Sequence, residues 1–424
     1  MSDLSTANSP DALIDPQFRK QTNKRLTWLR ILWWATGLLA ILSVIRAVTG
    51  VDNLSSAGTV AAALGLAVPI GMAGLGGLWS ERAGVVNIGL EGMLILGTFG
   101  AGWAGYQWGP WAGLAAAIAF GALGGLIHAV ATVTFAVDQI VVGVAINILA
   151  IGITQFLAAE WFQGASGGGS TQSPPIAPIG TVTLPGISSV AQTISETDIF
   201  FVSDLAGLIA GLTTNVSYIT LIAVFAVVAT GFILWRTAFG LRLRSCGEAP
   251  YAAATLGVPV RTYKYIAVIM SGALAGLGGA YLAIVAAGIY REGQTGGRGY
   301  IGLAAMIFGN WRPGGLMAGA ALFGYTDALQ LRGGEAVHAL LLLLAVLLAA
   351  YGGYMLYRRR LRGGAISLLI AAGVLSWYLT TTDVPPQFAF IAPYLATLLV
   401  LAFATQRLRM PAADGQPYLK GEEH

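Results

Sequence analysis

The sequence predicts an all-α, polytopic integral membrane protein, and three observations support this prediction. Of the 424 residues, 56% are hydrophobic and 10% are charged, and the mean hydropathy is +0.72. Soluble domains carry about a quarter of charged residues, so this chain lacks the polar surface that would face water. Apolar runs of about 20 residues recur, which is the length that spans a bilayer as a helix. The 58 glycines fall within these runs, where small residues let helix backbones approach closely.

The apolar runs predict about twelve crossings between two tails. They lie near residues 28–48, 57–79, 84–105, 110–136, 140–162, 217–236, 265–287, 299–309, 314–331, 336–357, 365–381 and 388–405. This count places the basic loop 237–264 and the RRRLR run at 358–362 on one side with both chain ends, as the positive-inside rule requires. We therefore expect cytoplasmic tails at 1–27 and 406–424 and a transmembrane domain over 28–405.

Two apolar segments are not expected to be simple crossings. Residues 199–215 are apolar, but a crossing there would place loop 237–264 outside, so we expect a re-entrant or surface helix. Residues 299–309 and 314–331, joined by NWRPG, are too short for two full spans. They predict a hairpin of broken helices, which a membrane tolerates only where it is buried in protein or lines a cavity.

The longest predicted outer loop covers residues 163–198. It is rich in Gly, Ser, Thr and Pro and has no periodic apolar pattern of its own. The loop is either a passive linker or a docking surface for an external partner.

The inner loop 237–264 predicts a short cytoplasmic helix at about 248–257. Pro250 suits the first turn of a helix, because its missing N–H has no partner there. The alanines that follow favour helix, and Gly257 is a residue type that ends helices. This helix is either a plain connector or a rigid knob on the cytoplasmic face.

The sequence carries no enzyme motif. It has no G-x-x-x-x-G-K-[ST] loop, so we expect no ATP hydrolysis by this chain itself. The three histidines are scattered, and the single cysteine, Cys246, excludes an internal disulfide or a cysteine-based metal site. The net charge of +4 lies in short loops, which argues for orientation in the bilayer rather than for nucleic-acid binding. We expect no metal, no cofactor and no nucleic acid.

Several stretches carry a resemblance to a known family. CGEAPYAAATLGVPVRTYKYIAVIMSGALAGLGGAYLA (246–283) resembles the coupling loop and following helix of ABC-importer permeases of the branched-chain amino acid and ribose branch. SERAGVVNIGLEGMLILG (80–97) closely resembles the general nucleoside or simple-sugar sub-branch, which works with basic-membrane-lipoprotein-type binding proteins. Residues 138–157, 297–331 and 415–421 are similar to the same sub-branch.

The resemblance implies a permease subunit of an importer in the bacterial plasma membrane. Nucleosides are the expected solutes, with simple sugars as the alternative. The implied partners are a separate ATP-binding subunit, a second and usually different permease subunit, and an extracytoplasmic solute-binding lipoprotein. Residues 334–383 depart from the family pattern and read as an inserted pair of helices. An ion-coupled secondary transporter and a membrane enzyme are the rival classes, and they gain little support.

The polar residues of the segment 80–93 are the first candidates for the solute path. If the segment were helical from Gly84 onward, Gly84, Asn87, Ile88 and Glu91 would share one face. That face would present an amide and a carboxylate at membrane depth, where an ionisable residue is a functional hypothesis by default. The alternative is that Glu91 braces a broken helix by accepting orphan backbone N–H groups.

Two further sets of residues complete the expected sites. Gln139 and Asn147 in the fifth crossing are weaker candidates for the path, because Asn is also common between packed membrane helices. For the adjacent Glu81 and Arg82, the alternative to a role in the solute path is an ordinary interfacial pair. Through the resemblance, five residues of the inner loop are assigned to coupling with the ATPase: Gly247, Glu248, Pro250, Ala253 and Gly257.

Overall fold

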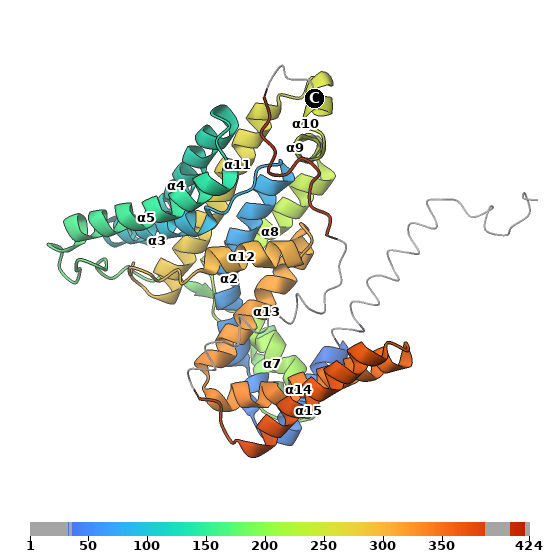
Figure 1. Ribbon diagram of the computed structural model, residues 1–424. Helices are drawn as coiled ribbons and strands as arrows, with labels where there is room; N and C mark the ends of the chain where they lie inside the picture. The colour runs from blue at the N-terminus through green and yellow to red at the C-terminus, as the bar shows by residue number, and fades with distance from the viewer. Residues whose placement is uncertain (1–32, 34–35, 386–407, 420–424) are drawn as a thin grey trace, which may run out of the picture.

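Helices make up most of the protein. The computed structural model describes residue 33, residues 36–385 and residues 408–419 (Figure 1). The start of the expected crossing 28–48 and the whole of 388–405 lie outside the described residues. The described β-structure includes β1 (Thr181–Val182) and β2 (Val216–Ser217), a two-stranded antiparallel sheet in which Thr181 lies opposite Ser217.

The described helices follow the expected runs, with several boundaries moved. In chain order they are a helix over Thr36–Thr49, the 3-10 turn η2 (Asp52–Leu54), α2 (Ala57–Arg82), α3 (Leu90–Trp108), α4 (Pro110–Ala129), the π-turn η3 (Val130–Thr134), α5 (Gln139–Phe162), α6 (Ile187–Ser195), α7 (Val202–Thr213), α8 (Tyr218–Arg236), α9 (Ala238–Glu248), α10 (Pro250–Thr255), α11 (Val260–Ala280), the π-turn η4 (Tyr281–Ala286), α12 (Arg298–Phe308), α13 (Pro313–Leu331), α14 (Gly334–Tyr357) and α15 (Leu361–Thr380).

Within the described ranges, seven helices are long and apolar enough to cross a membrane. They are Asp52–Arg82, Pro110–Thr134, Gln139–Phe162, Tyr218–Arg236, Val260–Ala286, Gly334–Tyr357 and Leu361–Thr380. The chain is therefore a polytopic membrane protein. Two shorter apolar helices, Val202–Thr213 and Arg298–Phe308, occupy segments that were not expected to be full crossings.

The membrane helices differ strongly in how much of their surface the protein covers. In the span Asp52–Arg82, 72% of the apolar window is buried, and every residue from Ala67 to Glu81 is buried. In Leu361–Thr380, 17% is buried. The first is therefore the centre of the bundle, and the second presents most of its surface outward.

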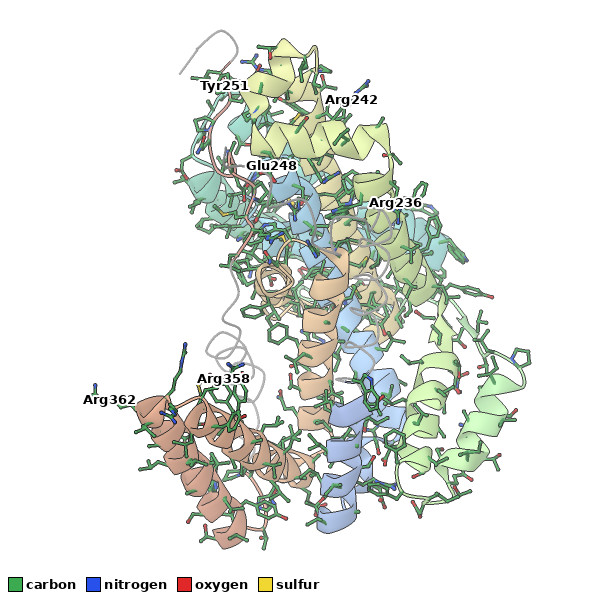
Figure 2. The ribbon with its side chains drawn as sticks, turned by 90° about the vertical axis from the view of Figure 1, so that its right-hand side faces the viewer. Arg236, Arg242, Glu248, Tyr251, Arg358 and Arg362 are labelled. Carbon is green, nitrogen blue, oxygen red and sulfur yellow. The ribbon has the colours of Figure 1, made fainter. Side chains whose placement is uncertain are left out.

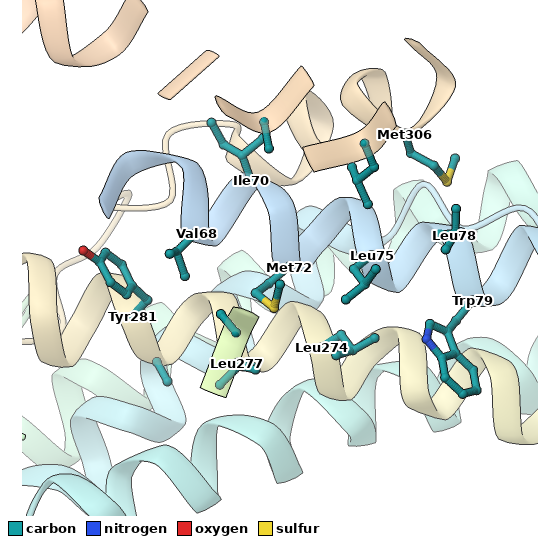
Figure 3. Close-up of a cluster of buried hydrophobic side chains, with 14 of the residues drawn as sticks. Val68, Ile70, Met72, Leu75, Leu78, Trp79, Leu274, Leu277, Tyr281 and Met306 are labelled. Atoms are coloured by element: carbon teal, nitrogen blue, oxygen red, sulfur yellow. The ribbon is translucent and has the colours of Figure 1, made fainter. Parts of the chain in front are cut away.

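The core forms where α2 and α11 run side by side. Met72 and Leu75 of α2 face Leu274 and Leu277 of α11 (Figure 3). Lipid tails are as apolar as these side chains, so close packing rather than transfer from water holds such helices together. The tightness of that packing decides which residues fit at the helix contacts.

Glycines bring α11 close to its other neighbour, α4. A Cβ added at Gly272 would overlap the carbonyl oxygen of Gly121, and one at Gly125 would overlap that of Val268. An alanine at either position would push the two helices apart.

Residues 334–383 form the hairpin of α14 and α15, while their status as an insertion into the family pattern stays a prediction. Ser367 Oγ donates to Leu348 O at 2.8 Å across this hairpin. In both views the α14–α15 hairpin lies at the end of the molecule opposite α9 and α10 (Figures 1 and 2). Figure 2 places Arg358 and Arg362 well away from Arg242, although the twelve-crossing count puts them on one side.

The structure corrects three local predictions. The third crossing begins at Leu90 rather than at 84. The inner loop contains two helices rather than one, since α9 ends at Glu248 and α10 covers only Pro250–Thr255. The outer loop 163–198 contains α6 and β1, although it has no clear periodic pattern.

Candidate functional site

The segment 80–93 connects α2 to α3, and its middle is not helical. Helix α2 is capped at Ala83, and Gly84 has φ +78°, a left-handed conformation that favours glycine. The N–H of Val85 then returns to Ser80 O at 3.1 Å, which closes the end of α2. The predicted helical face through Gly84, Asn87 and Glu91 is therefore wrong, because this turn interrupts the helix until Leu90.

Glu91 lies in the first turn of α3 and holds the start of α12. Its Oε1 accepts from Gly297 N at 3.0 Å, and its Oε2 accepts from Gly299 N at 2.7 Å. The carboxylate is 6% exposed. The first N–H groups of a helix have no partner within it, and negative charge is favoured there. This geometry is that of the bracing alternative.

Asn87 and Gln139 fasten the non-helical segment to its neighbours. Asn87 Nδ2 donates to Ser271 Oγ of α11 at 2.9 Å, and its Oδ1 accepts from Gly89 N at 3.0 Å. Gln139, at the start of α5, accepts from Val86 N through Oε1 at 2.6 Å. Both side chains are buried and satisfy backbone or side-chain groups of the protein.

Asn147 of α5 connects the segment to the molecular surface. Its Oδ1 accepts from Gly92 N at 2.7 Å, and its Nδ2 donates to Ile88 O at 3.1 Å and to Tyr300 Oη at 2.9 Å. Asn147 is 5% exposed, whereas Tyr300 on α12 is 47% exposed. Sequence reasoning missed Tyr300. Its place at the start of a predicted broken helix was the signal that could have found it.

Glu81 and Arg82 both contact the link at the far end of α12. Trp311, in the link between α12 and α13, donates from Nε1 to Glu81 Oε2 at 2.5 Å. Arg82 donates from Nε and Nη2 to Trp311 O at 3.1 and 2.7 Å. Asn310 and Trp311 have φ values of +55° and +51°, which non-glycine residues rarely adopt. Both residues therefore contact the link between α12 and α13, and the alternative of an ordinary interfacial pair stays a prediction.

A buried lysine supports the same segment. Lys264 of α11 is 2% exposed, and its Nζ donates to Gly84 O at 2.9 Å. The sequence analysis used this lysine only as one of the positive charges that place loop 237–264 inside. The fold brings it back to the left-handed turn at Gly84.

The expected coupling residues divide into two groups on α9 and α10. Gly247, Pro250 and Ala253 are buried against the membrane domain, while Glu248 and Gly257 are exposed. Pro250 occupies the first position of α10, and Gly257 follows it with φ +81°, as predicted. The exposed side of α10 therefore belongs to other residues, which sequence reasoning did not single out: Ala252, Thr255 and Leu256.

The described part of the chain shows no group of three or more His, Cys, Asp or Glu side chains that could hold a metal ion. His128 Nε2 donates one hydrogen bond to Val86 O at 3.0 Å inside the bundle. Cys246 is fully buried, and burial raises the pKa of its thiol to about 11.

The polar segment, the hairpin and the inner helices all lie within one region of similarity to known proteins. A family model described as branched-chain amino acid transport system / permease component matches residues 59–351. The chain belongs to this permease family. The permease is thus a transport component and not an enzyme, and it resides in the plasma membrane as a multi-pass protein.

Named relatives resemble the permease over most of its length. It is 35% identical to the guanosine ABC transporter permease protein NupQ of Bacillus subtilis, covering 86% of this chain and 97% of NupQ. It is 32% identical to the nucleoside ABC transporter permease protein NupC of Lactococcus lactis, over 84% and 94% of the two chains. It is 34% identical to the putative glucose ABC transporter permease protein TsgC13 of Haloferax volcanii, over 86% and 98%. No solved structure matches the chain.

Membership in this family settles the general role of the permease. ABC permeases act with an ATP-binding subunit and with a solute-binding protein, so energy and part of the selectivity come from other chains.

Proposed function

We propose that the permease carries nucleosides into the cell as one membrane subunit of an ATP-binding cassette importer. The single observation that carries this proposal is the similarity to a guanosine permease along nearly all of that protein. The similarity to a putative glucose permease, at almost the same identity, favours simple sugars as the second candidate.

The solute meets Tyr300 on the wall of the path, and Asn147 positions the tyrosine from behind. The ring is half exposed, and its hydroxyl accepts from Asn147 Nδ2, which leaves the hydroxyl proton free to point outward. An aromatic ring stacks on a nucleobase and contributes about 1–3 kcal/mol. Asn87, Glu91 and Gln139 shape this wall by holding the backbone beneath it, rather than by touching the solute.

The test of the solute uses the complete transporter in proteoliposomes with its solute-binding lipoprotein. Uptake of labelled guanosine should be inhibited by other nucleosides and not by glucose or ribose. Tyr300→Ala should raise the guanosine KM about tenfold to a hundredfold, since about 1–3 kcal/mol of stacking is lost, and Tyr300→Phe should raise it less. Inhibition by glucose but not by nucleosides would make this a sugar permease. An unchanged KM in Tyr300→Ala would remove Tyr300 from the path.

The exposed side of α10 is the docking face for the ATP-binding subunit. Leu256, just after α10, is 85% exposed and offers an apolar side chain to a partner on this face. Ala253 anchors the helix from the buried side, and its N–H donates to Ala249 O at 2.9 Å. Ala253→Pro removes that donor and should loosen ATPase attachment, because a proline inside a helix costs about 3 kcal/mol. Attachment and transport at wild-type levels would exclude this docking face.

The topology that we propose has twelve crossings with both termini in the cytoplasm. Cys246 is a poor probe of it because the thiol is buried. Leu256→Cys and Tyr357→Cys each place a thiol at a site where the native side chain is 85% exposed. In cells lacking the ATP-binding subunit, both should react with an impermeant maleimide in inside-out vesicles and not in intact spheroplasts. Labelling of Tyr357→Cys from the outside would overturn the count beyond α13.

The second membrane subunit is a related but different permease. Bacillus subtilis has another guanosine ABC transporter permease protein, NupP, that is 26% identical to this chain over 60% of it. The outer face of α5 offers a surface for such a partner, since Ile140, Val144 and Ile148 are all well exposed. Co-purification of a tagged permease with one distinct permease, in equal amounts, is the expected result. Recovery of only identical copies would contradict it.

A further inference from the structure

The C-terminal tail, residues 408–419, folds back onto the end of the molecule that carries α9 and α10. In Figure 1 it is the dark red segment beside these helices, and Figure 2 shows Glu248 and Tyr251 on the same end. Ala413 N donates to Gly247 O at 2.9 Å, and Ala412 N donates to Glu248 Oε2 at 3.3 Å. The tail is thus hydrogen-bonded to the last residues of α9.

The same tail contacts the broken hairpin and the short helix α10. Arg409 N donates to the Oδ1 of Asn310 in the α12–α13 link at 2.7 Å. At the other end of the tail, the rings of Tyr418 and Tyr251 lie 5.2 Å apart, and Tyr418 also packs against the main core. One extended stretch therefore touches the hairpin link, α9 and α10 in succession.

The middle of the tail is seated against the left-handed turn that follows α2. Ala413 is 6% exposed, and a Cβ added at Gly84 would lie 3.2 Å from Ala413 O. Gly84 is the residue whose carbonyl Lys264 holds. Both oxygens of Asp414 are buried with no hydrogen-bond partner among the described residues. A charged carboxylate is costly to bury in this way, so burial favours the neutral form of Asp414 in the docked tail.

Apart from the tail, two contacts join α9 to the segment 80–93 among the described hydrogen bonds, ion pairs and glycine contacts, and both are weak. Gly247 packs tightly against Arg82 and Gly84, but that contact supplies only close packing. The ion pair between Arg82 and Glu248 is long, at 3.8 Å, and the glutamate side chain is 53% exposed. Exposed ion pairs contribute little. The tail adds a backbone hydrogen bond to Gly247 of α9 and a partly buried ring, Tyr418, that packs on Tyr251 of α10.

We propose that residues 408–419 form a strap that carries the movement of α9 and α10 to the α12–α13 hairpin. The strap connects the end of α9 to the Asn310–Trp311 link. A displacement of α10 by the ATP-binding subunit therefore pulls on the hairpin, whose first turn carries Tyr300. This proposal rests on the proposed docking of that subunit on α10. It makes the tail a positioning element for transport and not part of the docking face itself.

The experiment uses the complete transporter in proteoliposomes, with full-length permease variants. Tyr418→Ala removes the ring that packs on Tyr251, and Asn310→Gly removes the acceptor for Arg409 N while keeping a residue that tolerates positive φ. Tyr357→Ala is the matched control, since Tyr357 is 85% exposed at the far hairpin. Attachment of the ATP-binding subunit, its ATP hydrolysis, and uptake per ATP consumed are measured for each variant.

Both tail variants should keep the ATP-binding subunit attached and hydrolysing, while uptake per ATP falls roughly fivefold, consistent with the loss of one ring pair or one hydrogen bond. Tyr357→Ala should match the wild type in all three. Uptake per ATP at the wild-type level in both tail variants would overturn the strap. Loss of the ATP-binding subunit in either would also overturn it, because the tail would then belong to the docking face.

A separate variant distinguishes failure of the strap from failure of the proposed docking. Leu256→Arg places a charge on the exposed side of α10, away from the tail contacts. Detachment of the ATP-binding subunit in Leu256→Arg, together with coupled transport in the tail variants, would keep the docking and reject the strap. If Leu256→Arg leaves attachment intact, the docking proposal fails, and the strap, which rests on it, fails with it.

Discussion

The two ends of α12 are both held by the segment around the α2–α3 connection, but in different ways. At the start of α12, one carboxylate, Glu91, accepts from two backbone N–H groups. At the link between the helices, Glu81 and Arg82 hold Trp311 through an indole and a carbonyl. One short polar stretch in an apolar chain thus anchors a broken hairpin twice.

The difference between these ends suggests a division of labour. The Glu91 contacts involve the helix backbone, which cannot rearrange without breaking the first turn of α12. The link contacts involve the indole and the carbonyl of Trp311, which lie outside any helix. The link also contacts the C-terminal tail through Asn310. We infer that the hairpin pivots at Glu91 and is driven at Trp311, with Tyr300 near the pivot.

The largest effect is expected from Glu91→Leu. It leaves two backbone N–H groups without an acceptor, and each such loss costs about 1–3 kcal/mol. Thermal unfolding in detergent should occur at clearly lower temperature, with lower protein levels in the membrane, and transport should scale with the protein that remains. Glu91→Gln keeps one acceptor and should lie between. A Leu variant that is as stable as the wild type but impaired in uptake per complex would favour direct solute contact at Glu91.

A smaller effect is expected at the driven end from Trp311→Phe. The ring volume is partly kept, but Glu81 loses the indole donor, and a buried acceptor left without its donor costs about 1–3 kcal/mol. Uptake should fall more than stability, because Glu91 still holds the start of α12. Glu81→Gln combined with Trp311→Phe should cost less than the sum of the two single changes. Strict additivity would mean that the two side chains do not act together.

Arg82→Lys should give a milder change at the same end. Lysine keeps the charge, but it cannot present two fixed N–H groups to Trp311 O. A loss of about 1 kcal/mol is expected for one hydrogen bond. The corresponding control is Arg242→Lys on α9, which should behave as the wild type in uptake. Equal losses in both variants would mean that the two-donor contact of Arg82 with Trp311 O is not the cause of the loss.

The smallest effect is a pH dependence of tail docking. Burial raises the pKa of Asp414 from its usual 3.8 to about 7. Neighbouring Glu81, Lys264 and Arg82 lower this pKa and offset part of the shift. The docked tail therefore binds the proton more tightly than the undocked tail. Docking should be strongest below about pH 4 and should weaken as the pH rises through about 7.

Hydrogen exchange of the tail amides across that range measures the effect. Protection should fall with rising pH in the wild type, after correction for intrinsic exchange rates, and should stay level in Asp414→Asn. The same decline in both proteins would assign the dependence to another group.

Much of this protein follows from local patterns in its sequence. Hydropathy and charge predicted a polytopic membrane protein, because a bilayer demands long apolar helices wherever the chain crosses it. The short apolar runs around NWRPG predicted the broken hairpin. Pro250 and Gly257 marked the start and the stop of α10, since both act through their own backbone conformation.

What local patterns could not supply were the partners of the polar residues. Glu91 was recognised as important, but its acceptor role depends on Gly297 and Gly299, about 200 residues further along the chain. The turn at Gly84 replaced a predicted helical face, because Lys264 and Gln139 hold this segment in place from other helices. Periodicity describes one element at a time, whereas a hydrogen bond between distant elements exists only once packing has brought them together. Tertiary structure alone therefore decided that these charges brace a hairpin and that the tail returns to them.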